Sequence, residues 1–375
     1  MKPLVSIITP SYNQGKFIRE TIESVLSQDY DNFEYIIIDG GSTDNTADIV
    51  KDYENRLTFI MEQDNGQSNA INKGFIMAKG EIVAWLNSDD LYEPHCISRA
   101  VKEFEENAKL ALLYGEGYII DENSNKIRIF EHTQEFDYWK LVNFWDYIMQ
   151  PTAFFKKTYL QKVGYLDEQL HYCMDWDLWI KLAAVGEVKY IPDLLACSRE
   201  YADTKTNTGG DKRLEEIVCL LQKYSGKEKP LGIKSYRASS FYIKHAEDMW
   251  LFRKLAGYYL TCVHKRLYRR LPFKDAEGRI GRRYALAVPG TVREITISVE
   301  KVFQNKKRQK VNIYINQEKA EEKMMNHLGI ENIVLKLQSG NFLNEIVIEC
   351  PTAINIGCKY NRKLCLKIIN CNYEI

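Results

Sequence analysis

The segment EIVAWLNSDD, residues 81–90, is a short apolar run that ends in two adjacent carboxylates. Three similar runs precede it, and segments with helical periodicity separate the four. The upstream runs are residues 4–9, 33–38 and 57–61, and the helical segments are residues 17–26, 47–50 and 70–77. This alternation predicts an α/β fold in which crossover helices join mostly parallel strands. It is typical of a nucleotide-binding half-domain.

The chain is more varied after residue 90. We expect a hairpin, an amphipathic helix, a strand and then a polar loop that is a candidate lid. These lie at residues 111–120 with 126–130, 175–185, 187–191 and 201–211. Helical periodicity follows to about residue 270, and alternating apolar runs after residue 285 predict a small β-sandwich. The predicted domains are therefore 1–212, a helical segment 213–284, and 285–375.

Composition limits the classes of function. A chain of 375 residues is too long for one ordinary core. Its 51 basic residues balance its 51 acidic ones, which argues against a nucleic-acid partner. Nine cysteines without a Cys-x-x-Cys pair favour reduced thiols. With no long apolar segment near the amino terminus, we expect a cytoplasmic protein, soluble or peripheral on the membrane.

Polar residues follow several of the predicted strands. Asp89 and Asp90 end the fourth strand, where two hard oxygen donors suit Mg²⁺ or Mn²⁺ holding a diphosphate. A helix cap before Pro94 is the alternative. Tyr12, after the first strand, could stack on a base, and Asp39, at the end of the second, could accept a hydrogen bond from a nucleoside.

Two further segments contain candidate groups at the starts of helices. Lys73, together with the amino-terminal amides of the helix that the segment at residues 64–74 opens, could face a phosphate, although a plain loop-to-helix junction explains the segment almost as well. Asp175 begins the segment DWDLW. It is either a catalytic base or a carboxylate that complements the helix dipole.

Together these segments resemble family 2 glycosyltransferases, which are inverting enzymes. The motifs occur in the family's order over residues 5–210. They are VSIITPSYNQ (5–14), IIDGGSTDNT (37–46), DNGQSNAINKG (64–74), WLNSDD (85–90), QPTAFF (150–155) and MDWDLW (174–179). The resemblance implies a nucleotide-diphospho-sugar transferase fold, with a mostly parallel central sheet and flanking helices.

The resemblance also implies roles for single residues. Pro10, Tyr12 and Asp39 would hold the nucleoside, Asp89 would lie near the ribose and diphosphate, Asp90 would bind the divalent cation, and Asp175 would be the catalytic base. The family often has Glu directly before that base, where this chain has Met174. Arg199, Lys205 and Thr206 resemble the flexible segment that closes over the donor diphosphate, although Lys205 and Thr206 fit a solvated loop equally well.

The expected partners are a nucleotide-sugar donor, most simply a UDP-sugar, and a glycan or lipid-linked acceptor in surface polysaccharide synthesis. The basic cluster His264, Lys265, Arg266, Arg269 and Arg270 leaves contact with an anionic membrane open, although a solvated helix face is the commoner meaning of such a cluster. A homodimer also remains open. The alternative functions are a sugar-nucleotide nucleotidyltransferase and a non-catalytic sugar-binding protein.

Overall fold

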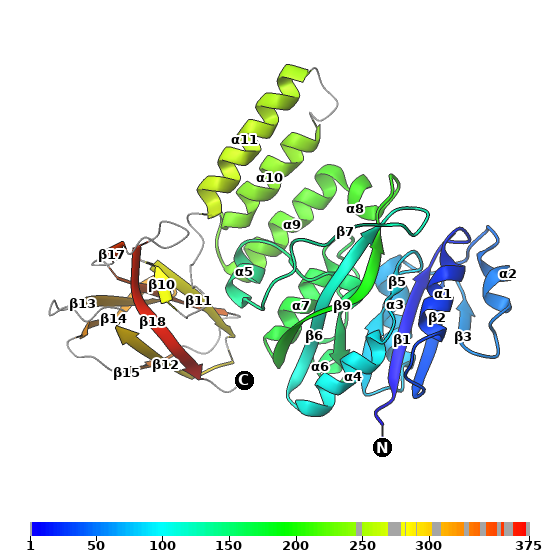
Figure 1. Ribbon diagram of the computed structural model, residues 1–375, viewed down its shortest axis with the longest axis horizontal. Coiled ribbons are helices and arrows are strands. Elements are labelled where there is room, and N and C mark those ends of the chain that lie inside the picture. Colours follow the sequence, from blue (N-terminus) through cyan, green and yellow to red (C-terminus); the bar gives the residue numbers. More distant parts are fainter. Residues whose placement is uncertain are drawn as a thin grey trace. The chain divides into compact units, whose positions relative to one another are not determined.

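The computed structural model describes residues 2–244, 250–268, 279–281, 283–289, 291–301, 309–325, 330–337, 343–350, 354–355 and 363–372. The chain forms two compact units. The first comprises Met1–Phe136 and Asp146–Leu220, and the second comprises Asp137–Trp145 and Leu221–Ile375 (Figure 1). The three domains expected from the sequence remain a prediction beside this division into two.

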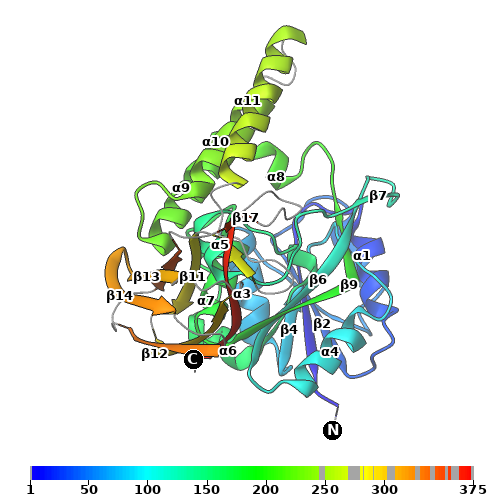
Figure 2. The ribbon, with the colours of Figure 1, turned by 60° about the vertical axis from the view of Figure 1, so that its left-hand side comes forward.

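The first unit contains a nine-stranded sheet in the order β3-β2-β1-β4-β8-β6-β9-β5, with β7 beside β6. The strands are β1 (Val5–Ser11), β2 (Phe33–Asp39), β3 (Thr58–Met61), β4 (Ile82–Trp85), β5 (Leu91–Tyr92), β6 (Leu110–Ile120), β7 (Lys126–Ile129), β8 (Phe154–Lys156) and β9 (Glu187–Arg199). β3, β2, β1 and β4 are parallel, as are β6 and β9, which lie side by side in Figures 1 and 2. β8 runs antiparallel between these two groups.

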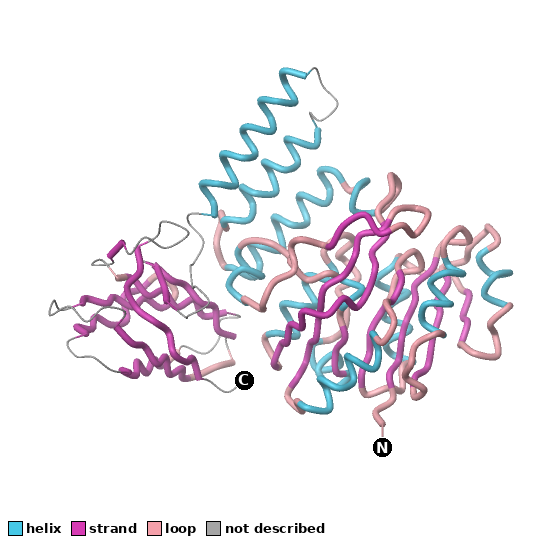
Figure 3. Tube along the Cα trace, viewed as in Figure 1, coloured by secondary structure: helices cyan, strands magenta, loops and turns pink. Residues whose placement is uncertain are grey.

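Helices surround this sheet, as the cyan segments of Figure 3 show. They are α1 (Ile18–Leu26), α2 (Thr46–Lys51), α3 (Gln67–Met77), α4 (Cys96–Glu106), α6 (Lys157–Val163), α7 (Met174–Ala183) and α8 (Lys205–Thr208), with the 3-10 turn η1 at Gln150–Thr152. The first four predicted strands, the three helices between them and the predicted hairpin are confirmed, with shifts of a few residues at their ends.

Alternation along the strands assigns the helices to two faces of the sheet. Val5 and Ile7 of β1 pack in one apolar cluster with residues of α1 and α4. On the other face, Trp85 of β4 stacks on Trp179 of α7, with ring centroids 5.4 Å apart, and contacts Phe75 of α3. Helices α3 and α7, which carry candidate site residues, therefore share one face of the sheet.

The segment predicted as a polar loop at residues 201–211 differs from that expectation. The strand before it runs on to Arg199, so β9 is much longer than the predicted strand at 187–191. Within the loop, α8 forms, and α9 (Gly210–Ser225) begins at its end. The long β9 results from its pairing with β6, a contact between distant parts of the chain that periodicity alone does not reveal.

The second unit contains α5 (Tyr138–Asn143), α10 (Leu231–Lys244) and α11 (Trp250–Tyr268), of which α10 and α11 lie side by side in Figure 2. Its strands are β10 (Arg279–Gly281), β11 (Arg283–Pro289), β12 (Glu294–Lys301), β13 (Gln309–Ile315), β14 (Glu318–Met325), β15 (Ile330–Lys336), β16 (Leu343–Glu349), β17 (Ile354–Asn355) and β18 (Lys363–Asn372). They form two sheets, β10-β18-β12-β15 with β17 beside β18, and β11-β16-β13-β14. Ile297 and Ile333 of one sheet share a core with Ile313 and Ile346 of the other, which confirms the predicted sandwich.

None of the helices within the described ranges is long and apolar enough to cross a membrane. Arg269 and Arg270, which belong to the predicted basic cluster, lie outside the described residues.

Candidate active site

Two turns meet at the carboxyl ends of β1 and β2, as the sequence predicts. The backbone N–H of Asn13 donates to Ser42 Oγ at 2.7 Å, and the Thr43 N–H donates to Asn13 Oδ1 at 2.8 Å. A third turn approaches from β3, since a Cβ added to Gly40 would lie 2.6 Å from Asp64 Oδ2. A larger residue at position 40 would therefore displace the Asp64 side chain from this turn.

The predicted nucleoside residues occupy this edge with very different exposure. Tyr12 is 61% exposed, so its ring is available to a ligand, whereas Asp39 is fully buried. Asp39 Oδ1 accepts from the N–H groups of Gly41 and Ser42, and its Oδ2 accepts from the Ser42 hydroxyl. Asp39 therefore builds the turn on which a nucleoside would rest.

Pro10 and Lys73 are placed less directly. Pro10 is buried in β1 opposite Ile38, beyond the last residue that pairs with β4, so its missing N–H costs no hydrogen bond to that strand. Lys73 lies in α3, where its ammonium pairs with Glu62 at 2.7 Å and reaches the Gln63 carbonyl at 3.3 Å. The structure thus directs Lys73 toward the end of β3.

The adjacent carboxylates that follow β4 have different environments. Asp90 is 3% exposed, and its oxygens accept from the Arg199 N–H at 2.9 Å and the Asn87 amide at 3.1 Å. Burial, together with the charge of Asp89, raises the pKa of Asp90 to about 8. Asp89 is only half-buried, and its Oδ2 accepts from the Tyr201 hydroxyl at 2.9 Å. Burial also raises the pKa of Asp89.

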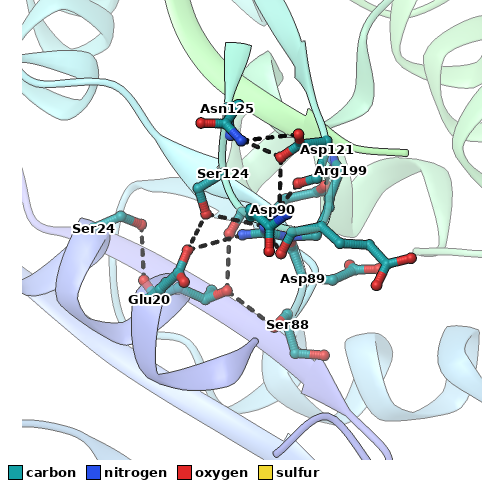
Figure 4. A network of polar contacts seen from close by, with 12 residues as sticks. Glu20, Ser24, Ser88, Asp89, Asp90, Asp121, Ser124, Asn125 and Arg199 are labelled. Atoms are coloured by element: carbon teal, nitrogen blue, oxygen red, sulfur yellow. Dashed lines mark hydrogen bonds and ion pairs between the residues drawn. The ribbon is translucent and has the colours of Figure 1, made fainter. Parts of the chain in front are cut away.

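Arg199, expected in a flexible segment, is instead a fully buried side chain at the end of β9. Figure 4 shows its surroundings: the guanidinium donates to Glu20 of α1 and to Ser124 and the Asp121 carbonyl, which both lie in the turn between β6 and β7. It also donates to the Asp89 carbonyl at 2.8 Å. Since these partners fix the guanidinium, Arg199 holds the backbone around the carboxylates in place.

Lys205 and Thr206, the other two candidates of the donor loop, lie in α8. Thr206 is exposed, whereas Lys205 is half-buried and donates to Gln67 Oε1 at 2.8 Å. Tyr201, before α8, packs on Phe17 with ring centroids 5.2 Å apart while its hydroxyl reaches Asp89. Tyr201 and Lys205 therefore tie this segment to two sides of the site.

Three amide side chains, Gln67, Asn87 and Gln150, form a hydrogen-bonded chain that connects Lys205 with Asp90. The Gln67 amide donates to Asn87 Oδ1 at 2.9 Å, and the Asn87 amide donates both to Asp90 and to Gln150 Oε1. The Gln150 amide in turn donates to the Trp85 carbonyl at 2.9 Å. Lys205 is thereby linked to Asp90 through two amide side chains.

Asp175 lies in the first turn of α7, half-buried, with Oδ1 accepting from the Trp176 N–H at 2.8 Å. Burial raises the pKa of Asp175, and the charges of Lys205 and Arg213 oppose the rise. A second carboxylate interacts with it electrostatically: burial and then the charge of Asp175 raise the pKa of Asp146 well above its ordinary value. Asp175 is therefore a candidate proton acceptor in a poorly solvated position.

The residues present fit a divalent cation. Asp89 and Asp90 place hard oxygen donors side by side, and a cation would offset the cost of burying both charges. Within the part of the chain that the structure describes, no group of three or more His, Cys, Asp or Glu side chains is arranged to hold a metal.

Sequence reasoning assigned no role to Tyr201, Asp146 or Glu216. Tyr201 opens the segment that was predicted as a loop, so its position was visible but its contact with Asp89 was not. Asp146 and Glu216 carry no local signal, because their relation to the site arises only when distant segments come together. Glu216 receives three backbone N–H groups at the start of α7, as described below.

Comparison with known proteins identifies the family. Residues 6–164 match the model of Glycosyl transferase family 2. An uncharacterized glycosyltransferase of Rickettsia prowazekii is 32% identical over 268 residues, which cover 68% of this chain and 81% of that protein. Hyaluronan synthase of Pasteurella multocida is 26% identical over 302 residues, 80% of this chain but 30% of that enzyme.

Among solved structures, S. aureus TarS residues 1–349 in complex with UDP-GlcNAc is similar with a TM-score of 0.48 and 18% identity, covering 71% of this chain and 72% of that one. The Rickettsia relative matches over most of its own length, and the family model matches the part of the chain that contains the first three strands and the carboxylate pair. On these grounds the chain belongs to glycosyltransferase family 2.

Proposed function

We propose that the enzyme transfers a sugar from a nucleotide-diphosphate donor, expected to be a UDP-sugar, to a hydroxyl group of a glycan or lipid-linked acceptor, with inversion at the anomeric carbon. One observation carries the proposal. Lys205, whose charge acts on Asp175, is joined through Gln67 and Asn87 to Asp90. The candidate base and the carboxylate pair therefore border one polar site, as a displacement reaction requires.

Asp175 is the proposed general base. Its half-buried carboxylate would take the proton of the acceptor hydroxyl while that oxygen attacks the anomeric carbon and the bond to the diphosphate breaks. Because burial disfavours its charged form, the carboxylate is a stronger base than a solvated one. General-base assistance of this kind typically contributes about 10²- to 10⁴-fold in rate.

Asp89 and Asp90 would hold Mn²⁺ or Mg²⁺, whose charge would stabilise the departing diphosphate by several kcal/mol. The two carboxylates differ in what they offer. Asp90 already accepts from Arg199 and Asn87 and is almost fully buried, whereas Asp89 is half-buried and accepts from the Tyr201 hydroxyl. We therefore assign the main contact to Asp89, in place of the expected Asp90, and give Asp90 the role of supporting it.

Tyr12 and the turn built by Asp39 are the proposed nucleoside platform, since they lie at the same strand edge as the carboxylates. Pro10 shapes the end of β1 beneath them. We propose that the enzyme takes part in the synthesis of a surface polysaccharide. It would act in the cytoplasm, either free in solution or bound to the cytoplasmic face of the membrane.

The donor is identified by a thermal-shift and turnover screen of UDP-, GDP-, dTDP- and CMP-sugars with and without Mn²⁺. For the wild type we expect a Mn²⁺-dependent shift with one nucleotide. Asp89→Asn should lose that shift with little change in its own melting temperature. Asp90→Asn should instead also lose about 1–3 kcal/mol of stability, because the Arg199 N–H and the Asn87 amide donate to different oxygens of the buried Asp90 side chain and an amide keeps only one of those acceptors.

Asp175→Asn is the matching test of the base. It should keep the donor shift while turnover falls by about 10²- to 10⁴-fold. A folded wild type that responds to none of the four donor classes contradicts the proposed function. Normal turnover by Asp175→Asn contradicts only the assignment of the base.

A further inference from the structure

Glu216 of α9 receives three consecutive backbone N–H groups. Its Oε2 accepts from His171 at 2.9 Å, and its Oε1 accepts from Tyr172 at 2.6 Å and from Cys173 at 2.5 Å. The side chain is half-buried. Hydrogen bonds to an ionised acceptor are among the stronger ones in proteins, and three of them converge here on one carboxylate.

These three residues lead directly into α7. Cys173 is the residue that caps the helix, Met174 begins it, and Asp175 follows. The Cys173 side chain makes no capping hydrogen bond at the start of α7, and the Glu216 carboxylate of α9 accepts from the amides just before it. A negative charge at that end also complements the helix dipole. The position of Asp175 therefore depends on how firmly residues 171–173 are held.

The opposite side of the same loop is fixed to α3. The Asn72 amide donates to the Leu166 carbonyl at 3.0 Å, and the Leu166 N–H donates back to Asn72 Oδ1 at 3.0 Å. The Ser68 hydroxyl donates to the Leu170 carbonyl at 3.2 Å. α3 thus holds residues 166–170, and Glu216 holds the three residues between that point and the helix.

We propose that Glu216 is a positioning residue for the catalytic base, which it acts on by holding the backbone immediately before α7. This rests on the proposed role of Asp175. Glu216 also lies on the helix that follows the candidate lid, α8, directly in the chain. Lys205 of α8 and Arg213 of α9 both act electrostatically on Asp175, so the same segment supplies the charges around the base and the carboxylate that places it.

The same helix offers a matched control. Glu215 precedes Glu216 and is exposed to solvent, so Glu215→Gln makes the same change of charge without touching the loop. Glu216→Gln keeps one acceptor oxygen and should retain some of the hydrogen bonds from residues 171–173, whereas Glu216→Ala removes all three of these hydrogen bonds. A small misplacement of a catalytic group costs up to about 10²-fold in rate.

The experiment uses the full chain. Release of nucleoside diphosphate is measured with the donor that the screen selects and water as acceptor, and binding of UDP with Mn²⁺, or of the nucleotide selected, is measured by calorimetry. We expect kcat to fall about 10-fold for Glu216→Gln and about 100-fold for Glu216→Ala, with nucleotide affinity within about twofold of the wild type. Glu215→Gln should match the wild type in both.

The pH dependence of kcat distinguishes positioning from a general loss of stability. Asp175 is surrounded by Asp146, Lys205 and Arg213, and burial holds its pKa up. A loosened loop admits water, so the acidic limb of kcat should move to lower pH in the Glu216 variants and stay fixed in Glu215→Gln. Accelerated amide exchange at Tyr172 and Cys173 should accompany it.

Different outcomes test the positioning role of Glu216 and the proposed role of Asp175 as the base. If Asp175→Asn is inactive while both Glu216 variants keep the wild-type kcat and pH profile, the positioning role is wrong and the proposed function stands. If Asp175→Asn has normal turnover, the base is misassigned and the role of Glu216 is wrong with it. A loss of nucleotide affinity equal to the loss of kcat would indicate a disordered site and would also overturn the inference.

Discussion

Single side chains at the site divide into those that hold the chain in place and those that remain exposed and that we propose contact the ligands. Asp90 and Arg199 belong to the first kind, because the Arg199 N–H meets an Asp90 oxygen and the Arg199 guanidinium is fully buried. Asp89, Tyr12 and Asp175 retain exposed surface. The sequence located the carboxylate pair at a strand end, but it did not reveal which member faces inward, since the deciding partner lies 109 residues away.

Asp175 offers a test of stability that is independent of the donor. Its folded-state pKa is raised above the unfolded value by burial, so the folded protein binds more protons than the unfolded chain between those two values. Its ionised form therefore destabilises the fold above the folded pKa, and the effect vanishes as the pH falls below about 4, the unfolded value. Asp175→Asn should raise the melting temperature at pH 8 and approach the wild type at the acid end.

Differential scanning fluorimetry from pH 4 to pH 8 checks this expectation. Asp203→Asn is the control, because Asp203 is exposed to solvent and the same substitution there removes a carboxylate that is not buried. A lower melting temperature for Asp175→Asn at pH 8 would show that the carboxylate is stabilised by its surroundings, contrary to the pKa argument. A catalytic base kept at some cost to stability is a common finding in enzymes.

Secondary-structure elements near the start of the chain were predictable because their signals are local. Apolar runs of the right length marked β1 to β4, and the helical periods between them marked α1 and α3. The segment after β9 was not predictable in this way. Its form depends on Tyr201 packing on Phe17 and on Lys205 reaching Gln67, contacts that span distant parts of the sequence.

The Tyr201 hydroxyl would compete with the proposed cation for the Asp89 carboxylate. Its hydroxyl donates to Asp89 Oδ2, the same carboxylate that we assign to the cation. Tyr201→Phe removes the donor and keeps the ring on Phe17, so binding of Mn²⁺ with UDP should become about fivefold tighter, taking the hydrogen bond as about 1 kcal/mol. Isothermal titration calorimetry measures this directly.

Tyr53→Phe is the matched control, because the Tyr53 hydroxyl also donates to a carboxylate, Glu23, at 2.8 Å, on the exposed side of α1. It should leave the affinity unchanged. Weaker binding by Tyr201→Phe would mean that the hydroxyl assists the ligand, and the proposed competition would then be abandoned.

The whole molecule shows where prediction from sequence reaches its limit. The order of an α/β part, helices and a β-sandwich follows from changes in periodicity along the chain. The composition of the two compact units does not, since residues 137–145 leave the first unit and join the second. These residues contact strand β11, and Trp139 among them donates to Glu345, which lies 206 residues away.

Glu345 of the sandwich strand β16 forms a polar link to the inserted helix α5. Its Oε1 accepts from Trp139 Nε1 at 2.7 Å and pairs with Lys227, whose ammonium also donates to Asn143 Oδ1 at 3.0 Å.

Glu345→Gln removes the charge from a mostly buried bridge, which should cost about 1–3 kcal/mol. Amide exchange and limited proteolysis over residues 137–145 should then increase, whereas Glu318→Gln, at an exposed strand position, should change neither. Nucleotide binding should be unaltered by both substitutions, because the candidate site lies in the other unit. Unchanged exchange over residues 137–145 in Glu345→Gln would show that apolar packing alone, without this ionic bridge, keeps α5 in the second unit.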